Sequence, residues 1–145
     1  MKKEETAVIV GSMEELRISP DRMEKLEDGC FKDKYLSRHY GRDFIWSPKS
    51  QEKLIPREAA EKHAEEFGFL PSVFDWVSLF DYSKYNPALV QGAAVLELSM
   101  DDWYHADRKL AGSEGGAWVV DPGYGSVSFY NKVSSNYVRP VRSSQ

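Results

Sequence analysis

Charged and aromatic residues are divided unevenly along this 145-residue chain. Residues 1–66 hold 28 of the 42 charged residues but only five of the 19 aromatic ones. The other 79 residues hold 14 of each kind, together with most of the glycines. A charged half suited to helices, followed by an aromatic half suited to strands, is typical of an α+β domain with segregated elements. The sequence therefore predicts the α+β class.

Composition narrows the range of partners. The length suits one domain, and 41% hydrophobic with 29% charged residues is typical of a globular protein. The apolar runs are far shorter than the ~18 residues of a membrane span, so we expect no membrane partner. A formal net charge of -4 offers no general attraction to a phosphate backbone, which argues against a nucleic-acid partner.

The single cysteine and the amino terminus bear on the compartment. Cys30 cannot form an intrachain disulfide or a multi-cysteine zinc site, and we interpret it as a buried apolar thiol. The apolar stretch 7–10 is shorter than the roughly 7–15 residues of a signal-peptide core. We therefore expect a cytoplasmic protein, or a virion component made without a signal peptide.

Local signals predict short elements in the first forty residues. A β-branched run predicts a strand at 6–10. Ser19 and Pro20 match a helix start, with Gly29 as the end of that helix. Its apolar face would comprise Met23, Leu26 and Cys30. Residues 31–41 have no clean period and are interpreted as a loop or an irregular helix.

Two helices are predicted from helical spacing and from capping signals. A strand at 43–46 precedes a helix that begins near Pro56 and ends at Gly68. One face of this helix carries small or apolar residues, namely Ala59, Ala60, His63, Ala64 and Phe67. A second helix is predicted at 72–80, because Ser72 and Asp75 have the spacing of a capping box.

The second half is predicted to be rich in strands. Candidate strands lie at 93–98, 117–120, 126–130 and 137–142. Residues 122–125 suit a hairpin turn between two of them. Pro140 removes a backbone donor, so we expect the last strand to lie at an edge or to end near this residue.

Two separated segments carry a resemblance to a known family. Residues 70–88 read LPSVFDWVSLFDYSKYNPA, and the closing segments read AWVVD at 117–121, GSV at 125–127 and YVRPVR at 137–142. In order and spacing they resemble the Lcl C-terminal domain family, long catalogued as a domain of unknown function. The likeness covers about residues 43–142, so residues 1–42 are interpreted as an N-terminal extension packed on this domain or leading into it.

The resemblance implies a C-type-lectin-like α+β fold. In that fold two helices pack on a small twisted antiparallel sheet with a long irregular loop region. The fold serves sugar binding, protein binding and, in one relative, catalysis.

Histidine and carboxylate side chains are the candidates for acid–base catalysis and for calcium binding. His63 lies on the small-residue face of a predicted helix, so we expect it to be packed. His105 lies in a predicted loop with Asp101, Asp102 and Asp107, which are also the candidate ligands for calcium. The loop sequences of calcium-dependent lectins are absent, so we expect no metal or other cofactor and no catalytic residue.

The aromatic residues are the remaining candidates for binding. Trp46, Trp76, Trp118 and Phe129 lie on predicted elements and are expected in the core. Ligand-binding candidates are the residues of predicted loops and turns, namely Tyr82, Tyr85, Trp103, Tyr104, His105 and Tyr124. The alternative is that these aromatic residues fold back over a small core.

Three hypotheses of function follow. The first is a non-enzymatic binding module that presents residues 83–116 to a macromolecular ligand, with protein favoured over carbohydrate. The second is a phage or mobile-element protein that binds and inhibits a host protein. The third is an enzyme that uses His105 with Asp101 or Asp102. The sequence does not indicate the oligomeric state.

Overall fold

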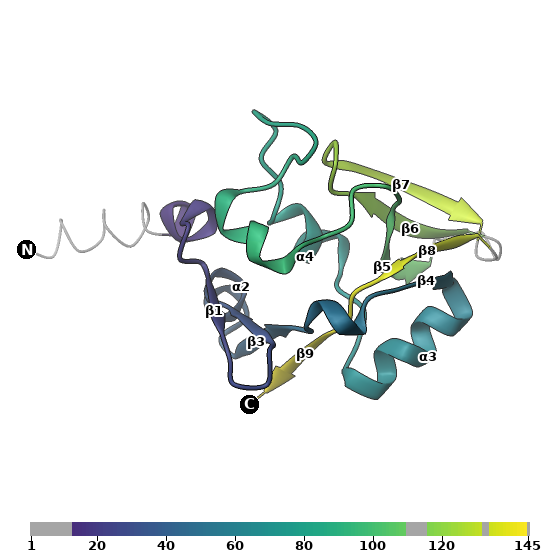
Figure 1. The fold of residues 1–145 in the computed structure, drawn as a ribbon, viewed down its shortest axis with the longest axis horizontal. Helices are drawn as coiled ribbons and strands as arrows, with labels where there is room; N and C mark the ends of the chain where they lie inside the picture. The colour runs from purple at the N-terminus through teal and green to yellow at the C-terminus, as the bar shows by residue number, and fades with distance from the viewer. Residues whose placement is uncertain (1–12, 110–115, 132–133, 145) are drawn as a thin grey trace, which may run out of the picture.

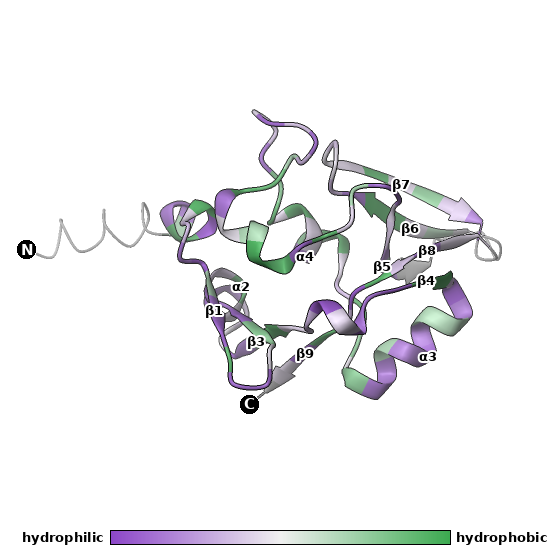
Figure 2. Cartoon of the chain, in the orientation of Figure 1, coloured by the Kyte–Doolittle hydropathy of each residue, from purple (hydrophilic) through white to green (hydrophobic). Residues whose placement is uncertain are grey.

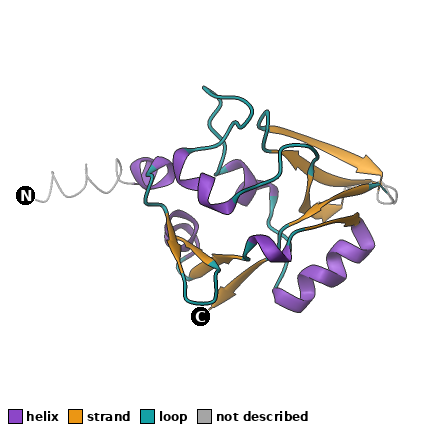
Figure 3. Cartoon of the chain, in the orientation of Figure 1, coloured by secondary structure: helices purple, strands orange, loops and turns teal. Residues whose placement is uncertain are grey.

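A computed structural model describes residues 13–109, 116–131 and 134–144 of the chain, which form a mixed α+β fold with two small sheets (Figures 1 and 3). The first sheet has the order β1-β2-β3-β9 and is antiparallel throughout. Its strands are β1 (Met23–Lys25), β2 (Phe31–Asp33), β3 (Asp43–Trp46) and β9 (Val141–Ser144). The predicted strand at 43–46 is therefore confirmed.

The second sheet has the order β4-β8-β5-β6-β7. Its strands are β4 (Lys53–Pro56), β5 (Tyr104–Lys109), β6 (Gly116–Asp121), β7 (Ser126–Asn131) and β8 (Ser135–Val138). The β5–β8 pair is parallel, through Tyr104 and Tyr137, and the other pairs are antiparallel. The predicted hairpin turn at 122–125 is confirmed, because it connects the antiparallel pair β6 and β7.

The predicted strand at 137–142 is divided between the two sheets. β8 ends at Val138, β9 begins at Val141, and Pro140 lies in the break, as its missing N–H predicted. Buried Arg139 stabilises the crossing, since its guanidinium donates to the carbonyl oxygens of Ser47 (2.9 Å) and Leu96 (2.8 Å).

The helices confirm the sharper predictions. α3 (Arg57–Phe67) runs between Pro56 and Gly68 as predicted. α4 (Val73–Val77) has the predicted capping box of Ser72 and Asp75, but it ends three residues before the predicted end at 80. The remaining helical segments are residues 13–18, α2 (Lys34–Tyr40), the 3₁₀ turn η1 (Lys49–Gln51) and the 3₁₀ segment η2 (Gln91–Leu96).

The helix predicted after Ser19 and Pro20 is wrong. β1 and β2 form a hairpin there, closed by a backbone hydrogen bond from Leu26 to Cys30 (2.8 Å) and by Gly29 at φ +85°. A left-handed glycine favours a turn over a continuing helix. Residues 31–41, left as a loop or irregular helix, form β2 and the regular helix α2. The strand predicted at 6–10 lies outside the described residues.

The strand predicted at 93–98 is also wrong, because η2 occupies most of this segment. Its start packs closely on the N-terminal segment: a Cβ on Gly92 would lie 2.4 Å from the carbonyl oxygen of Ser19. Ala93 donates to Val90 (3.0 Å) in the short-range pattern of a 3₁₀ turn. The apolar run thus forms a 3₁₀ segment with three of its six residues buried, and periodicity alone does not distinguish such a segment from a strand.

The main core lies between the sheets and against α4. Trp76 is its centre, with ring centroids 5.1 Å from Trp46 and 4.9 Å from Tyr104, and all three are fully buried. Along β6 most residues are hydrophobic, whereas α3 alternates between hydrophobic and hydrophilic residues (Figure 2). None of the helices in the described residues is long and apolar enough to cross a membrane.

The segment before residue 43 shares this core. Arg22 and Asp33 form a fully buried ion pair (2.9 Å), and Arg22 also donates to the carbonyl oxygen of Ser78 (2.7 Å). The indole N–H of Trp46 donates to the same Asp33 carboxylate (2.9 Å). The N-terminal strands are therefore tied to both β3 and the end of α4.

Candidate functional site

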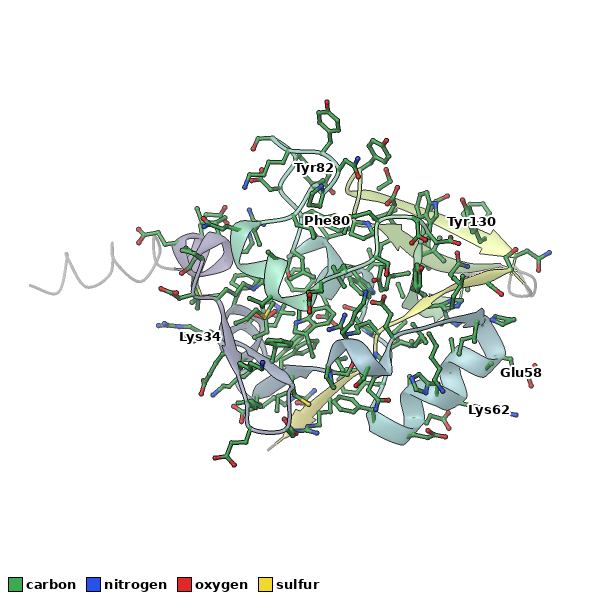
Figure 4. The ribbon with its side chains drawn as sticks, in the orientation of Figure 1. Lys34, Glu58, Lys62, Phe80, Tyr82 and Tyr130 are labelled. Carbon is green, nitrogen blue, oxygen red and sulfur yellow. The ribbon has the colours of Figure 1, made fainter. Side chains whose placement is uncertain are left out.

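Three exposed tyrosines come from two segments that lie side by side. Tyr82 and Tyr85 belong to the loop after α4, and Tyr124 belongs to the turn between β6 and β7. Their exposed fractions are 68%, 77% and 63%. Figure 4 shows Tyr82 at the end of the molecule away from Glu58 and Lys62 of α3. We call these three residues the tyrosine surface.

Backbone hydrogen bonds join the loop to the turn. The N–H of Asn86 donates to the carbonyl oxygen of Gly123 (2.5 Å), and the N–H of Ala88 donates to that of Pro122 (2.9 Å). The loop is also closed on itself, since Asp81 donates its N–H to Ala88 (2.8 Å). The two segments therefore form one unit, which holds the tyrosines in place.

Gly125 permits the close approach of the loop and the turn. It has φ +70°, and a Cβ at this position would lie 2.9 Å from the Tyr82 ring. Both the backbone conformation and the space therefore favour glycine. The ring of Tyr82 also packs edge-on against Phe80, with centroids 6.2 Å apart.

A hollow of about 560 Å³ adjoins the tyrosine surface. Its lining is mainly apolar, with a cation and an amide among the residues. The lining residues are Ser83, Lys84, Tyr85, Pro87, Leu89, Val90, Gln91 and Ala94. An exposed aromatic residue beside an apolar hollow is typical of a contact surface for another molecule.

Tyr104 and His105 are not surface residues, and their predicted place in a loop is wrong. Both belong to β5, whose strand buries them completely or nearly so. The Tyr104 hydroxyl donates to the Glu52 carboxylate and accepts the N–H of Ser99 (2.6 Å). Burial beside this carboxylate raises the pKa of Tyr104. Its role is to satisfy buried polar groups in the core.

His105 is 1% exposed, and none of the described carboxylates is hydrogen-bonded to it. Its Nε2 lies 2.8 Å from the carbonyl oxygen of Ile55, and burial lowers its pKa. Asp101 instead accepts the Tyr137 hydroxyl (2.9 Å), and Asp102 accepts the Trp103 N–H (2.8 Å). The structure therefore does not place His105 in hydrogen-bond contact with either aspartate.

The three calcium candidates are divided between two places. Asp101 and Asp102 line a hollow of about 250 Å³ with Trp103, whereas Asp107 lines a different groove beside α4. Half-buried Trp103 packs on Tyr130, with centroids 5.4 Å apart. Among the described residues, no group of three or more His, Cys, Asp or Glu side chains could hold a metal ion.

The other residues weighed from sequence are mostly packed. His63 is buried with its Nε2 2.6 Å from the carbonyl oxygen of Gln51, which confirms that it is a packed histidine. Cys30 is buried, as expected, and burial raises its pKa. Much of the predicted loop 83–116 is buried as well, in η2 and β5, and residues 110–115 lie outside the described part.

An apolar groove between α4 and the β6–β7 edge was missed from the sequence. It measures about 530 Å³ and is lined by Ser72, Val73, Phe74, Asp107, Trp118 and Val127. Trp118 is half-buried, and Phe129, predicted in the core, is 53% exposed. Phe129 is exposed because β7 is the last strand of its sheet and its inner face extends beyond the part of the sheet that α4 covers.

Tyr40 and Asp75 form a polar pair beside a smaller cavity of about 170 Å³. The Tyr40 hydroxyl donates to Asp75 (2.5 Å), whose other oxygen accepts the Ser72 N–H (2.9 Å). Burial raises the pKa of Asp75, and it raises that of Tyr40 to about 12. Both Asp75 oxygens are used by the helix cap and by Tyr40, which makes this carboxylate a structural one.

Comparison with solved structures finds a distant likeness. No protein-family model matches the chain, and no curated protein sequence matches it. The solved structure of the Yersinia pseudotuberculosis adhesin InvE superposes on 58% of this chain with a TM-score of 0.42 and 19% sequence identity. The superposed part is 23% of the adhesin chain. The region of similarity is thus less than a quarter of that adhesin.

Proposed function

We propose that this protein is a non-enzymatic binding module of C-type-lectin-like fold, and that its tyrosine surface binds a protein partner. The observation that carries the proposal is the joining of Tyr82, Tyr85 and Tyr124 into one exposed unit beside an apolar hollow. Tyrosine is enriched among residues that dominate binding energy, because it offers a large ring and a polar tip with few rotatable bonds.

The resemblance to the Lcl C-terminal domain family supports the fold part of the proposal. Motif residues 81–88 are those that close the loop and attach it to the β6–β7 turn. The carboxylate of Asp81 also accepts the N–H (3.0 Å) and hydroxyl (2.6 Å) of Ser83. The motif thus has a physical role, which is to hold a loop that carries exposed aromatic residues.

Preorganisation of the loop favours binding. A loop that is already hydrogen-bonded at both ends loses less conformational freedom when a partner binds. In this chain the bonds from Asn86 and Ala88 to the neighbouring turn supply that constraint. The tyrosines therefore meet a partner from a fixed backbone.

A protein partner suits this surface better than a calcium-bound sugar. Calcium sites need several carboxylate or carbonyl oxygens around one point. The three candidate calcium ligands, Asp101, Asp102 and Asp107, line other hollows. Beside the tyrosines lie instead Pro87, Leu89 and Val90, which suit apolar side chains of a partner.

The test is a binding measurement with matched variants. The immobilised wild-type chain of 145 residues would be used to isolate and identify a partner from a lysate of the source cells, and the purified partner would be titrated by calorimetry. We expect Tyr85→Ala and Tyr124→Ala each to weaken that affinity about 10- to 30-fold, which is about 1.4–2 kcal/mol and reaches the lower limit of an interface hot spot. Glu58→Ala, on exposed α3, is the control and should bind as wild type.

The proposal fails if the identified partner binds both tyrosine variants with wild-type affinity. Circular dichroism and thermal unfolding of each variant would establish that it is folded. Tyr85 and Tyr124 are suited to this test because both are largely exposed, so their truncation leaves the core intact.

A further inference from the structure

β7 is an edge strand without the usual protection. It ends the second sheet, and no strand in the described part of the chain pairs with its outer side (Figure 1). Its residues, SVSFYN, include no charge and no proline. Its six pairs with β6 run in unbroken register, so it has no bulge. An edge of this kind presents backbone N–H and C=O groups to another strand.

The other sheet edges in the described residues are blunted. β1 has three residues, two of them the charged Glu24 and Lys25. β4 contains Lys53 and Pro56. The outer side of β9 is occupied by Phe69, which exchanges two backbone hydrogen bonds with Val141 (2.8 and 2.9 Å). Charge, proline, shortness and cover are the devices that prevent edge pairing, and β7 lacks them.

The side chains of β7 extend the apolar groove to the edge itself. Phe129 pairs with Trp118, and Val127 pairs with Val120, so these residues share the face that α4 partly covers. Val127 and Phe129 are 38% and 53% exposed. Exposed apolar residues on the inner face of an uncovered edge indicate that the sheet continues into a partner.

We infer that two copies of this chain associate through antiparallel pairing of their β7 strands, which joins the two five-stranded sheets into one. A two-fold axis perpendicular to the sheet keeps each face continuous, so odd-numbered residues must lie opposite odd-numbered ones. An axis at Ser128 places Val127 opposite Phe129 of the second copy, and Phe129 opposite Val127. This register joins the two apolar faces.

The self-complementary sequence of β7 supports a second copy as the occupant, because the register brings Val127 and Phe129 of the two copies together and brings no charged residues together. In this register Ser128 faces its own equivalent, and Ser126 faces Tyr130 of the second copy. No like charges meet between the paired residues 126–130, because the segment has none. A five-residue strand pair is short, roughly 17 Å long, so we expect a weak dimer that forms at micromolar or higher concentration.

A charge-swap experiment tests both the association and the register. Ser128→Lys and Ser128→Glu each place two like charges directly opposite one another at the axis, which destabilises pairing. By sedimentation equilibrium from 5 µM to about 500 µM, we expect wild type to dimerise and each variant alone to dissociate at least tenfold more readily, a change of about 1.4 kcal/mol. Mixing the two variants in equal amounts should restore association, because Lys then faces Glu.

Ser50→Lys, an exposed serine on η1, is the matched control and should associate as wild type. Circular dichroism would check that each variant remains folded. A wild-type chain that stays monomeric across the whole range overturns the inference, and leaves this edge for a strand of another protein. Variants that associate as well as wild type overturn it too, because the pairing would then involve a different surface.

Discussion

Asp33 connects four parts of the fold through one carboxylate. It accepts hydrogen bonds from Nε and Nη2 of Arg22 (2.9 Å each), from the Trp46 indole (2.9 Å) and from the Leu36 N–H (2.9 Å) at the start of α2. A fully buried charge is tolerated when it is paired and fully hydrogen-bonded. This carboxylate therefore ties β1, α2 and β3 together.

At the residue scale, Gly125 supports the tyrosine surface. Gly125→Ala should destabilise the chain by roughly 1–2 kcal/mol from the left-handed backbone alone, and further by pushing away the Tyr82 ring. Gly41→Ala is the matched control, because Gly41 has φ +72° with nothing within 4 Å of the added Cβ. Urea unfolding would compare the two. Equal losses of stability would contradict the packing role of Gly125.

His105 makes a pH-dependent contribution to stability. Burial lowers its pKa from 6.5, so between the two pKa values the unfolded chain holds a proton that the folded chain does not. The free energy of unfolding should therefore fall as the pH drops below about 6.5, by at most ~1.4 kcal/mol per pH unit. Chemical denaturation from pH 5 to 8 would measure this, and His105→Gln should lessen the dependence.

His39→Gln is the control for that measurement, because His39 is exposed on α2. Comparing the two variants separates the effect of removing the buried ring from the effect of removing an exposed histidine. If His105→Gln had the same dependence as wild type, proton exclusion by the buried ring would not be the cause.

At the scale of elements, the junction between α3 and β9 depends on close contact. A Cβ on Gly68 would lie 2.2 Å from the carbonyl oxygen of Val141, a backbone atom that cannot rotate away. The Gly68 N–H ends α3 by donating to Ala64 (2.6 Å). The glycine therefore both terminates the helix and lets the following chain pair with β9.

We expect Gly68→Ala to cost about 1–3 kcal/mol or more, since either α3 or β9 must shift. Thermal unfolding would show a lower midpoint than that of Ala59→Ser, a change at an exposed position of the same helix. An unchanged midpoint for Gly68→Ala would mean that the strand moves aside at little cost.

At the scale of the whole molecule, residues 13–42 share one core with the rest of the chain. They supply β1, β2 and α2, and they bury Arg22, Asp33 and Leu36 completely. A chain that begins at residue 43 should therefore fail to fold, because Trp46 would lose the Asp33 partner and the first sheet would lose two strands. Amide signals in a proton–nitrogen NMR spectrum would be poorly dispersed. A well-dispersed spectrum would instead support an independent domain at 43–142.

Local sequence patterns predicted the elements whose signals lie within a few neighbouring residues. α3 followed from its helical period between Pro56 and Gly68, and the start of α4 from the Ser72–Asp75 capping box. The β6–β7 hairpin followed from the turn at 122–125. In each case the contacts that stabilise the element join residues close in the chain, so the local sequence is enough to predict the element.

The wrong predictions concern segments whose structure depends on contacts between residues far apart in the chain. Met23 pairs with Asp33 rather than continuing a helix, and η2 takes its form beside the distant Ser19. Tyr104 and His105 are buried because β5 lies in the middle of a sheet. The periodicity of a sequence does not reveal the order of strands in a sheet. Of the six ligand-binding candidates, the structure leaves Tyr82, Tyr85 and Tyr124 largely exposed and Trp103 half-buried.

The sequence by itself determined the α+β class, the two principal helices, the β6–β7 hairpin and a set of loop aromatic residues, because propensity, capping and turn chemistry act locally. Only the tertiary structure decided which aromatic residues face outward, that the N-terminal strands belong to the core, and that β7 is the last strand of its sheet among the described residues. Those outcomes depend on the order of strands and on the burial of charge between distant segments. Both are set by the free energy of the whole packed chain.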